Sequence, residues 1–126
     1  MKRALAAVAA LAVAALAAFA FLRLHVFEER HLEARAFPLR GLDLQAPESS
    51  GGVEYYGKLR MDVLIGADGI VESIEMKPST LPLAYQESAA GVFRAARWEP
   101  GRKWGLAVRS VKHVEVDFKP PSRALE

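Results

Sequence analysis

The sequence contains no cysteine, which excludes disulfide bonds, thiolate zinc sites, a thiol nucleophile and a lipid-modified N-terminal cysteine. Its net charge of +2 is too small to indicate nucleic acid as the main partner. Internal repeats and long proline-rich tracts are also missing. What remains is a chain of 126 residues, a length that fits one domain plus an appendage.

Polar side chains are absent from residues 4–22, which comprise eleven Ala, four Leu, two Val and two Phe. As a helix this segment would span roughly 28 Å, close to the ~30 Å hydrocarbon core of a bilayer. It predicts a membrane segment, because a soluble core helix is rarely apolar on every face. Its length favours a retained anchor. Cleavage behind Ala20 is the alternative, since Ala18-Phe19-Ala20 has the small-x-small shape of a signal-peptide cleavage site.

Positive charges on both sides of the apolar segment bear on its orientation. Lys2, Arg3 and the α-amino group precede it, and Arg23 follows directly, so the near flanks favour a cytoplasmic N-terminus. Three arginines between residues 30 and 40 favour the reverse. Because a short tail precedes the segment and a folded domain follows it, we predict a single-pass protein whose C-terminal domain is exported.

Residues 23–36 keep a helical pattern, with charged residues four positions apart and no helix breaker before Pro38. This pattern predicts one long helix that leaves the bilayer and ends near Phe37. Its two histidines are expected on the solvated surface, because no further ligands stand at metal-binding spacing. Residues 41–52 are rich in Pro, Gly and Ser and predict a linker.

A small α+β domain is predicted after this linker. Alternating apolar and polar residues over 58–65 predict a half-buried strand. Asp68-Gly69 then predicts a hairpin, and alternation resumes over 70–76 with Ile70 and Ile74 on the inner face.

A helix and a last strand complete the domain. Residues 83–97 carry one apolar stripe at helical spacing, formed by Tyr85, Ala89, Val92, Phe93 and Ala96. Residues 107–118 predict a strand that is long enough for a bulge near 110–112. The order strand, strand, helix, strand predicts a ββαβ domain over residues 55–119, a three-stranded antiparallel sheet with one helix packed on it.

Such a sheet has two open edges, and we predict that the last strand forms one of them. An unpaired edge is either protected or used to bind an extended peptide. The predicted peptide-binding edge consists of Val108, Ser110, Lys112, Val114, Val116 and Phe118.

A second candidate surface is basic. Between residues 94 and 112 six cationic side chains stand against Glu99 alone. This run is interpreted either as a solvated face or as a patch for an acidic peptide, lipid headgroups or the cell wall. The predicted patch consists of Arg94, Arg97, Arg102, Lys103 and Arg109.

The sequence shows no catalytic, cofactor-binding or metal-binding constellation. His113 is the one histidine of residues 55–119, and its phase in the last strand places it on the outer face. Ser110 lies three residues away on the same strand, which does not bring the two together as nucleophile and base. We therefore predict a protein that is not an enzyme and takes no cofactor.

Three stretches of the sequence resemble TonB C-terminal domains. Residues 57–71 are similar to that family's first hairpin, in which a glycine, an alternating strand, Asp-Gly and a second strand follow one another. Residues 95–101 resemble the family's helix end, where a Trp closes the helix before a Pro, and residues 111–118 stand where its last strand does. The resemblance covers residues 55–119, and an anchor before such a domain also matches the family's layout.

The resemblance implies an energy-transducer type protein of Gram-negative bacteria, with residues 1–22 in the inner membrane, a juxtamembrane helix and linker over 23–54, a periplasmic domain and a tail over 120–126. It implies strand addition to a peptide of an outer-membrane receptor for siderophores or vitamin B12, driven by an ExbB–ExbD-like complex. Residues 4–22 contain neither the Ser nor the His usual in the family's anchors, and the long Pro-rich spacer is missing. These departures leave the ExbB–ExbD coupling and the transmission of force open. The alternatives are a soluble periplasmic adaptor and a structural homodimer.

Overall fold

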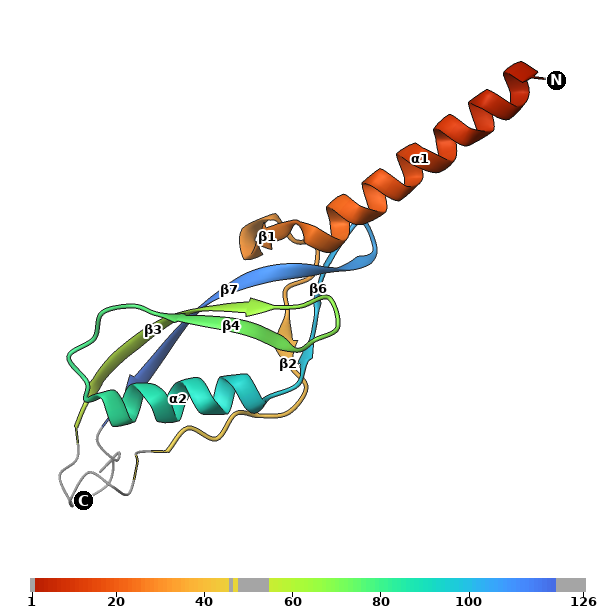
Figure 1. Ribbon diagram of the computed structural model, residues 1–126. Coiled ribbons are helices and arrows are strands. Elements are labelled where there is room, and N and C mark those ends of the chain that lie inside the picture. Colours follow the sequence, from red (N-terminus) through yellow and green to blue (C-terminus); the bar gives the residue numbers. More distant parts are fainter. Residues whose placement is uncertain (1, 46, 48–54, 120–126) are drawn as a thin grey trace.

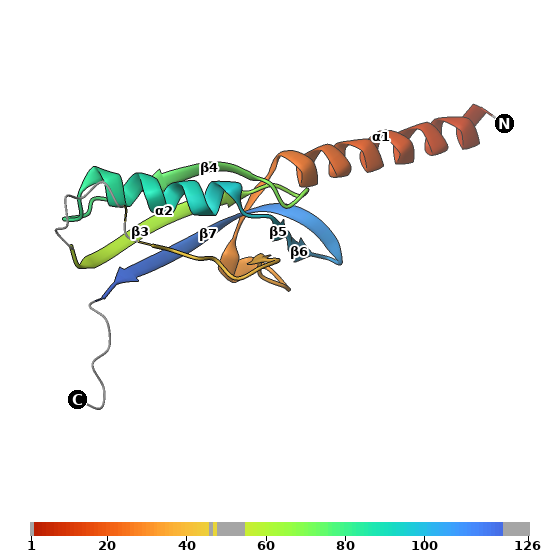
Figure 2. The ribbon, with the colours of Figure 1, turned by 90° about the horizontal axis from the view of Figure 1, so that it is seen from below.

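An antiparallel sheet with one helix on it forms the centre of the computed structural model, which describes residues 2–45, 47 and 55–119 (Figure 1). Strand β3 (Gly57–Ile65) pairs with β4 (Val71–Met76) on one side and with β7 (Leu106–Phe118) on the other. Helix α2 (Leu83–Ala95) lies across one face of this sheet in both views (Figures 1 and 2). The predicted α+β class is confirmed.

Two short strands that the sequence did not predict also join the sheet. Strand β1 (Val26–Glu28) lies parallel to residues 109–111 of β7, and β6 (Gly101–Lys103) forms a hairpin with the start of β7. A separate pair consists of β2 (Phe37–Pro38) and β5 (Trp98–Glu99). The predicted count of three strands is therefore wrong, because strands of two or three residues are too short to show alternation.

The core lies between α2 and the inner face of the sheet. On its strand side, four residues of β3 are at most 1 % exposed: Leu59, Met61, Val63 and Ile65. On its helix side lies the predicted apolar stripe. Its buried members are Tyr85, Ala89 and Phe93, and its partly buried members are Val92 and Ala96.

Strands β3 and β4 are joined by the hairpin that the sequence predicted. The Asp68 carboxylate accepts a hydrogen bond from the backbone N–H of Ile70 at 3.1 Å, and Gly69 has a left-handed φ of +80°. The register shifts at Ile65, which pairs with Val71. This shift buries Val71 and leaves Ile70 44 % exposed, so the inward position predicted for Ile70 is wrong.

Strand β7 runs without interruption for 13 residues. Its register with β3 is continuous from Ser110 to Phe118, so the bulge predicted near residues 110–112 is wrong. The length of β7 is explained by its three partners, because β6 pairs with residues 106–108, β1 with 109–111 and β3 with 110–118.

Helix α1 (Lys2–Leu24) ends earlier than predicted. The backbone N–H of His25 makes the last helical hydrogen bond, to the carbonyl of Phe21 at 2.8 Å. The chain then enters β1, and a single 3-10 turn follows over Glu29–His31. The juxtamembrane helix predicted up to Phe37 is therefore wrong.

Tertiary contacts explain why the segment after α1 is not helical. The side chain of Phe27 is buried. Glu28 lies 2.9 Å from the imidazole of His113, and Glu29 lies 2.8 Å from the ammonium of Lys112, both on β7. These contacts with β7 outweigh the local helical pattern, which is a weak determinant on its own.

Part of the predicted linker packs on the domain. Leu42 and Leu44 are partly buried against the core, and the Ser88 hydroxyl of α2 donates to the carbonyl of Gln45 at 3.5 Å. Residues 46 and 48–54 of the linker and the tail 120–126 lie outside the described residues. The predicted domain boundaries stay predictions.

Candidate functional site

The edge of β7 that faces away from β3 is covered along only part of its length. Strand β1 pairs with residues 109–111 there. Within the described part of the chain, no strand pairs with residues 112–118 on this side. At about 3.3 Å per residue, this stretch presents roughly 23 Å of strand edge. We call residues 112–118 the open edge.

Only alternate residues of an edge strand direct their backbone groups outward. The N–H of Lys77 donates to the carbonyl of Arg60 at 2.9 Å, so Arg60 directs its backbone groups towards β4. The next residue of β3, Met61, therefore directs its groups towards β7, where it pairs with Val114. Val114 in turn directs its backbone groups towards β3. The residues of the open edge whose backbone groups face outward are therefore His113, Glu115 and Asp117, which alternate with Lys112, Val114, Val116 and Phe118.

The six predicted edge residues have the opposite phase. Val108 pairs with Gly101 of β6, and Ser110 pairs with Phe27 of β1, so neither lies at an open edge. The other four direct their backbone groups to β3 and their side chains to the helix-covered face: Lys112, Val114, Val116 and Phe118. The sequence thus predicted the strand that carries the open edge but not its outward residues, because apolar alternation reports which face is buried and not which side of the strand is unpaired. Peptide binding by this strand stays a prediction.

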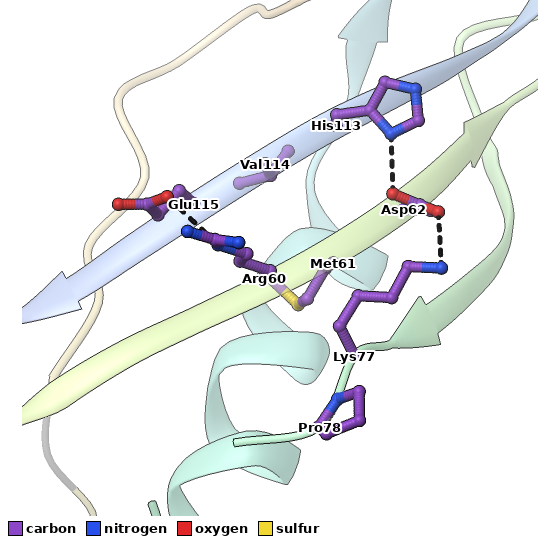
Figure 3. A pocket seen from close by; sticks show the side chains of 8 residues that line it. All are labelled: Arg60, Met61, Asp62, Lys77, Pro78, His113, Val114 and Glu115. Atoms are coloured by element: carbon purple, nitrogen blue, oxygen red, sulfur yellow. Dashed lines mark hydrogen bonds and ion pairs between the residues drawn. The ribbon is translucent and has the colours of Figure 1, made fainter. Parts of the chain in front are cut away.

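Charged side chains cross the solvent-facing side of the sheet beside the open edge (Figure 3). The imidazole of His113 lies 2.7 Å from the carboxylate of Asp62 through Nδ1 and 2.9 Å from that of Glu28 through Nε2. The ammonium of Lys77 lies 3.1 Å from Asp62 and 3.1 Å from Glu75. The predicted position of His113 on the outer face is confirmed. This row links β1, β7, β3 and β4 through side chains.

The two carboxylates beside His113 raise its pKa. The hydrogen bond to Glu28 raises the pKa of His113 above its ordinary value of 6.5, and the bond to Asp62 adds to this effect. The hydrogen bond from His113 in turn lowers the pKa of Asp62 below its ordinary value of 3.8. Asp62 is also the main cause that raises the pKa of Lys77. Because the His113 side chain is 56 % exposed, solvent screens these interactions.

A second cluster of charges centres on Glu115. Its carboxylate lies 3.3 Å from Lys58 and 3.3 Å from Arg60, and Lys58 is the main cause that lowers the pKa of Glu115. A shallow depression lies between the two clusters, lined by side chains such as Arg60, Lys77 and His113 (Figure 3). Its charged groups are bound to one another and form a polar sheet surface.

The predicted basic patch is spread over three parts of the fold: Arg94 in the last turn of α2 with Arg97 just after that helix, Arg102 and Lys103 in β6, and Arg109 in β7. Arg102 forms an ion pair with Glu99 at 3.2 Å, and Arg109 forms one with Glu72 at 2.7 Å. Among the described residues, two of the five cations therefore have carboxylate partners. Binding of an anion by this patch stays a prediction.

Strand β1 is the element of the site that the sequence reasoning missed. Its one signal is the pair Val26-Phe27, two residues that favour strands, directly after the apolar helix. A strand of three residues is too short to show a period of two. The acidic residues that follow Val26-Phe27 fit the surface of a helix as well as they fit a strand.

The fold is similar to a known domain. The solution NMR structure of the C-terminal domain of TonB from Pseudomonas aeruginosa matches with a TM-score of 0.55 at 20 % identity, covering 79 % of this chain and 98 % of that one. The 79 % exceeds the share occupied by residues 57–118, so the similarity also takes in segments outside β3–β7. No protein-family model and no curated protein matches the sequence. The predicted resemblance is confirmed for the fold.

Proposed function

We propose that this chain is a membrane-anchored, non-enzymatic protein whose C-terminal domain binds an extended peptide by strand addition to the open edge of β7. The observation that carries this proposal is that no described strand pairs with residues 112–118 on the side away from β3. The fold similarity to a TonB C-terminal domain supports it. In this role α1 lies in the inner membrane, the domain lies in the periplasm, and the peptide belongs to an outer-membrane receptor or another envelope partner.

The peptide pairs with the outward backbone groups of His113, Glu115 and Asp117. Each such hydrogen bond contributes about 0.5–1.5 kcal/mol net, so affinity also depends on side-chain contacts. Alternate peptide side chains would lie beside Val114 and Val116 on the helix-covered face, where the domain is apolar. We expect the preferred peptides to carry apolar residues at those alternate positions.

Helix α1 supports the membrane part of the proposal. In the described residues one helix is long and apolar enough to cross a membrane, over Arg3–Phe21, and none of that segment is buried in the protein. The positive charges that precede it favour a cytoplasmic N-terminus and so support the proposal of a domain on the opposite side of the membrane.

The junction between α1 and the domain limits how far the domain reaches. His25 alone separates Leu24 of α1 from Val26 of β1. While β1 stays paired with β7, the domain stays at the membrane surface, so energy transduction to an outer membrane requires β1 to separate from β7. Cleavage behind Ala20 would release a soluble adaptor that keeps β1, and a homodimer would use the same open edge.

Peptide binding to the full chain in phospholipid nanodiscs tests the proposal. A display library of random peptides of about ten residues is panned on the nanodiscs, and selected peptides are measured by fluorescence anisotropy. Glu115→Pro removes an outward N–H while the β3–β7 hydrogen bonds remain, and we expect it to weaken binding about tenfold or more. Glu115→Ala loses the same ion pairs with Lys58 and Arg60 but keeps the N–H, so it should bind like the wild type. Equal affinity of the two variants would contradict strand addition at this edge.

Two further measurements separate the alternatives. Mass spectrometry of the native N-terminus that finds a chain beginning at Phe21 would favour the soluble adaptor. Sedimentation that finds a dimer in the wild type and a monomer in Glu115→Pro would favour the structural homodimer.

A further inference from the structure

A chain of aromatic contacts crosses the junction between α1 and the domain. The rings of Phe21 and His25 stack at a centroid distance of 4.8 Å, and His25 contacts Phe27 edge-on at 4.5 Å. Phe27 then contacts Trp104 edge-on at 6.0 Å. Three ring contacts therefore connect the last turn of α1 to the turn between β6 and β7.

The turn between β6 and β7 lies beside the base of α1. In both views it is at the end of the domain from which α1 projects (Figures 1 and 2). The guanidinium of Arg109 in β7 donates to the carbonyl of Leu24, the last residue of α1, at 2.7 Å. Because the uninterrupted apolar segment ends at Leu22, this turn lies near the level at which α1 would leave the hydrocarbon core.

Trp104 occupies a backbone conformation that disfavours a large side chain. Trp104 and Gly105 have φ values of +52° and +74°, as in the type I′ turns that prefer Asn-Gly. A bulky residue in this region is strained. The carboxylate of Glu33 holds the turn by accepting hydrogen bonds from the backbone N–H groups of Trp104 at 2.8 Å and Gly105 at 3.3 Å. The fold therefore keeps an indole at a position where Asn would be less strained.

The Trp104 side chain gains little burial in return. It is 61 % exposed, whereas the other tryptophan, Trp98, is 3 % exposed. Leu106 beside it is 50 % exposed, and the ammonium of Lys103 lies 5.5 Å from the centre of the indole. Exposed aromatic and apolar residues next to an ammonium are typical of protein surfaces at the membrane interface, where Trp is enriched and Lys reaches the headgroups.

We propose that residues 103–106, the Trp104 tip, anchor the domain in the membrane interface. The partner is the phospholipid bilayer that α1 spans, with Trp104 and Leu106 at the boundary of the acyl chains and Lys103 at the headgroup phosphates. This inference rests on the membrane span of the proposed function and is independent of the peptide-binding edge. An anchored tip would fix the orientation of the domain relative to the membrane. The start of β7 would then lie at the membrane, and the open edge would lie towards the other end of the strand (Figure 1).

Lipid quenching of tryptophan fluorescence tests the Trp104 tip in the full chain. The chain holds two tryptophans, so Trp104→Phe reports buried Trp98 alone, and the wild type reports both. Both proteins are reconstituted into liposomes of phosphatidylcholine with brominated acyl chains. We expect the brominated lipid to quench the wild type several-fold more strongly than Trp104→Phe. Equal quenching of the two proteins overturns the proposal.

The membrane span is read out in the same sample, by flotation of the liposomes after an alkaline wash. A chain that floats but whose Trp104 is not quenched overturns the tip anchor and leaves the span intact. A chain that does not float overturns both. Emission from Trp104 that is blue-shifted but not quenched by the brominated lipid identifies contact with a second copy, and this also overturns the proposal.

Trp104→Asn separates lipid contact from stability of the fold. Because Asn suits the turn, we expect its denaturation midpoint to equal or exceed that of the wild type. In liposomes, trypsin should cleave after Lys103 several-fold faster in this variant, since the tip no longer inserts. A lower midpoint, or unchanged cleavage, assigns Trp104 a role inside the fold and overturns the proposal.

Discussion

The side chain of Phe27 decides whether β1 stays attached to β7. Phe27 is 7 % exposed, yet it is not part of the core cluster that β3, β4 and α2 form. Phe27→Ala should therefore detach β1 locally and leave the rest of the sheet folded.

The expected size of this effect follows from the contacts of β1. Removal of a buried Phe costs about 3–5 kcal/mol where the site does not collapse. Ordering the backbone of β1 opposes its attachment by about 1–2 kcal/mol per residue. The hydrogen bonds of β1 contribute about 0.5–1.5 kcal/mol each, and the partly exposed ion pair of Glu28 with His113 contributes at most about 1 kcal/mol. Without the Phe27 ring, the remaining favourable free energy of attachment nearly cancels the free-energy cost of ordering the backbone of β1, so β1 opens.

Hydrogen exchange of the full chain, followed by mass spectrometry, measures this opening. A loss of about 3 kcal/mol corresponds to about 100-fold faster exchange in residues 26–28 of Phe27→Ala, because each 1.4 kcal/mol is a factor of ten. Phe37→Ala is the matched control, since it removes the same atoms from a side chain that is 54 % exposed. Exchange in residues 59–65 should change little. The reasoning is refuted if β1 exchanges at the wild-type rate, or if β3 accelerates as much as β1.

Two further predictions concern the outer charges and the hairpin. Because the hydrogen bond to Glu28 raises the pKa of His113, this ion pair stabilises the attachment of β1 fully below pH 6.5, and its contribution is lost as pH rises through the raised value. Asp62 lies on β3, and its lowered pKa means that its contribution to the folded state is present above pH 3.8 and is lost as pH falls through the lowered value. Exchange of β1, corrected for its intrinsic pH dependence, should therefore increase above neutral pH in the wild type and not in His113→Gln. Gly69→Ala should lower the free energy of unfolding by more than about 2 kcal/mol, because its Cβ would collide with the carbonyl of Trp98 at a left-handed φ. An unchanged urea midpoint in Gly69→Ala would contradict this reason.

Local patterns predicted the elements whose residues repeat over several turns or pleats. The alternation over 58–65 and the stripe from Tyr85 to Phe93 correspond to β3 and α2 because each repeats the period of its own structure. Asp68-Gly69 predicted the hairpin because few residues adopt its turn. The predictions failed where a local pattern competed with distant partners, as in residues 25–36, whose helical spacing yielded to the burial of Phe27 against β7.

By itself, the sequence determined that an apolar segment precedes an α+β domain, and it predicted the long last strand that the structure shows as β7. The tertiary structure alone decided which part of β7 stays open, because on the side away from β3 strand β1 pairs with residues 109–111 through backbone groups that every residue type carries. It also decided that His113, Glu115 and Asp117 face outward, since that phase depends on whether Arg60 or its neighbour Met61 directs its backbone groups towards β4. The sequence specifies the chemistry of each side chain directly, whereas backbone pairing depends on which strands lie side by side in the folded protein.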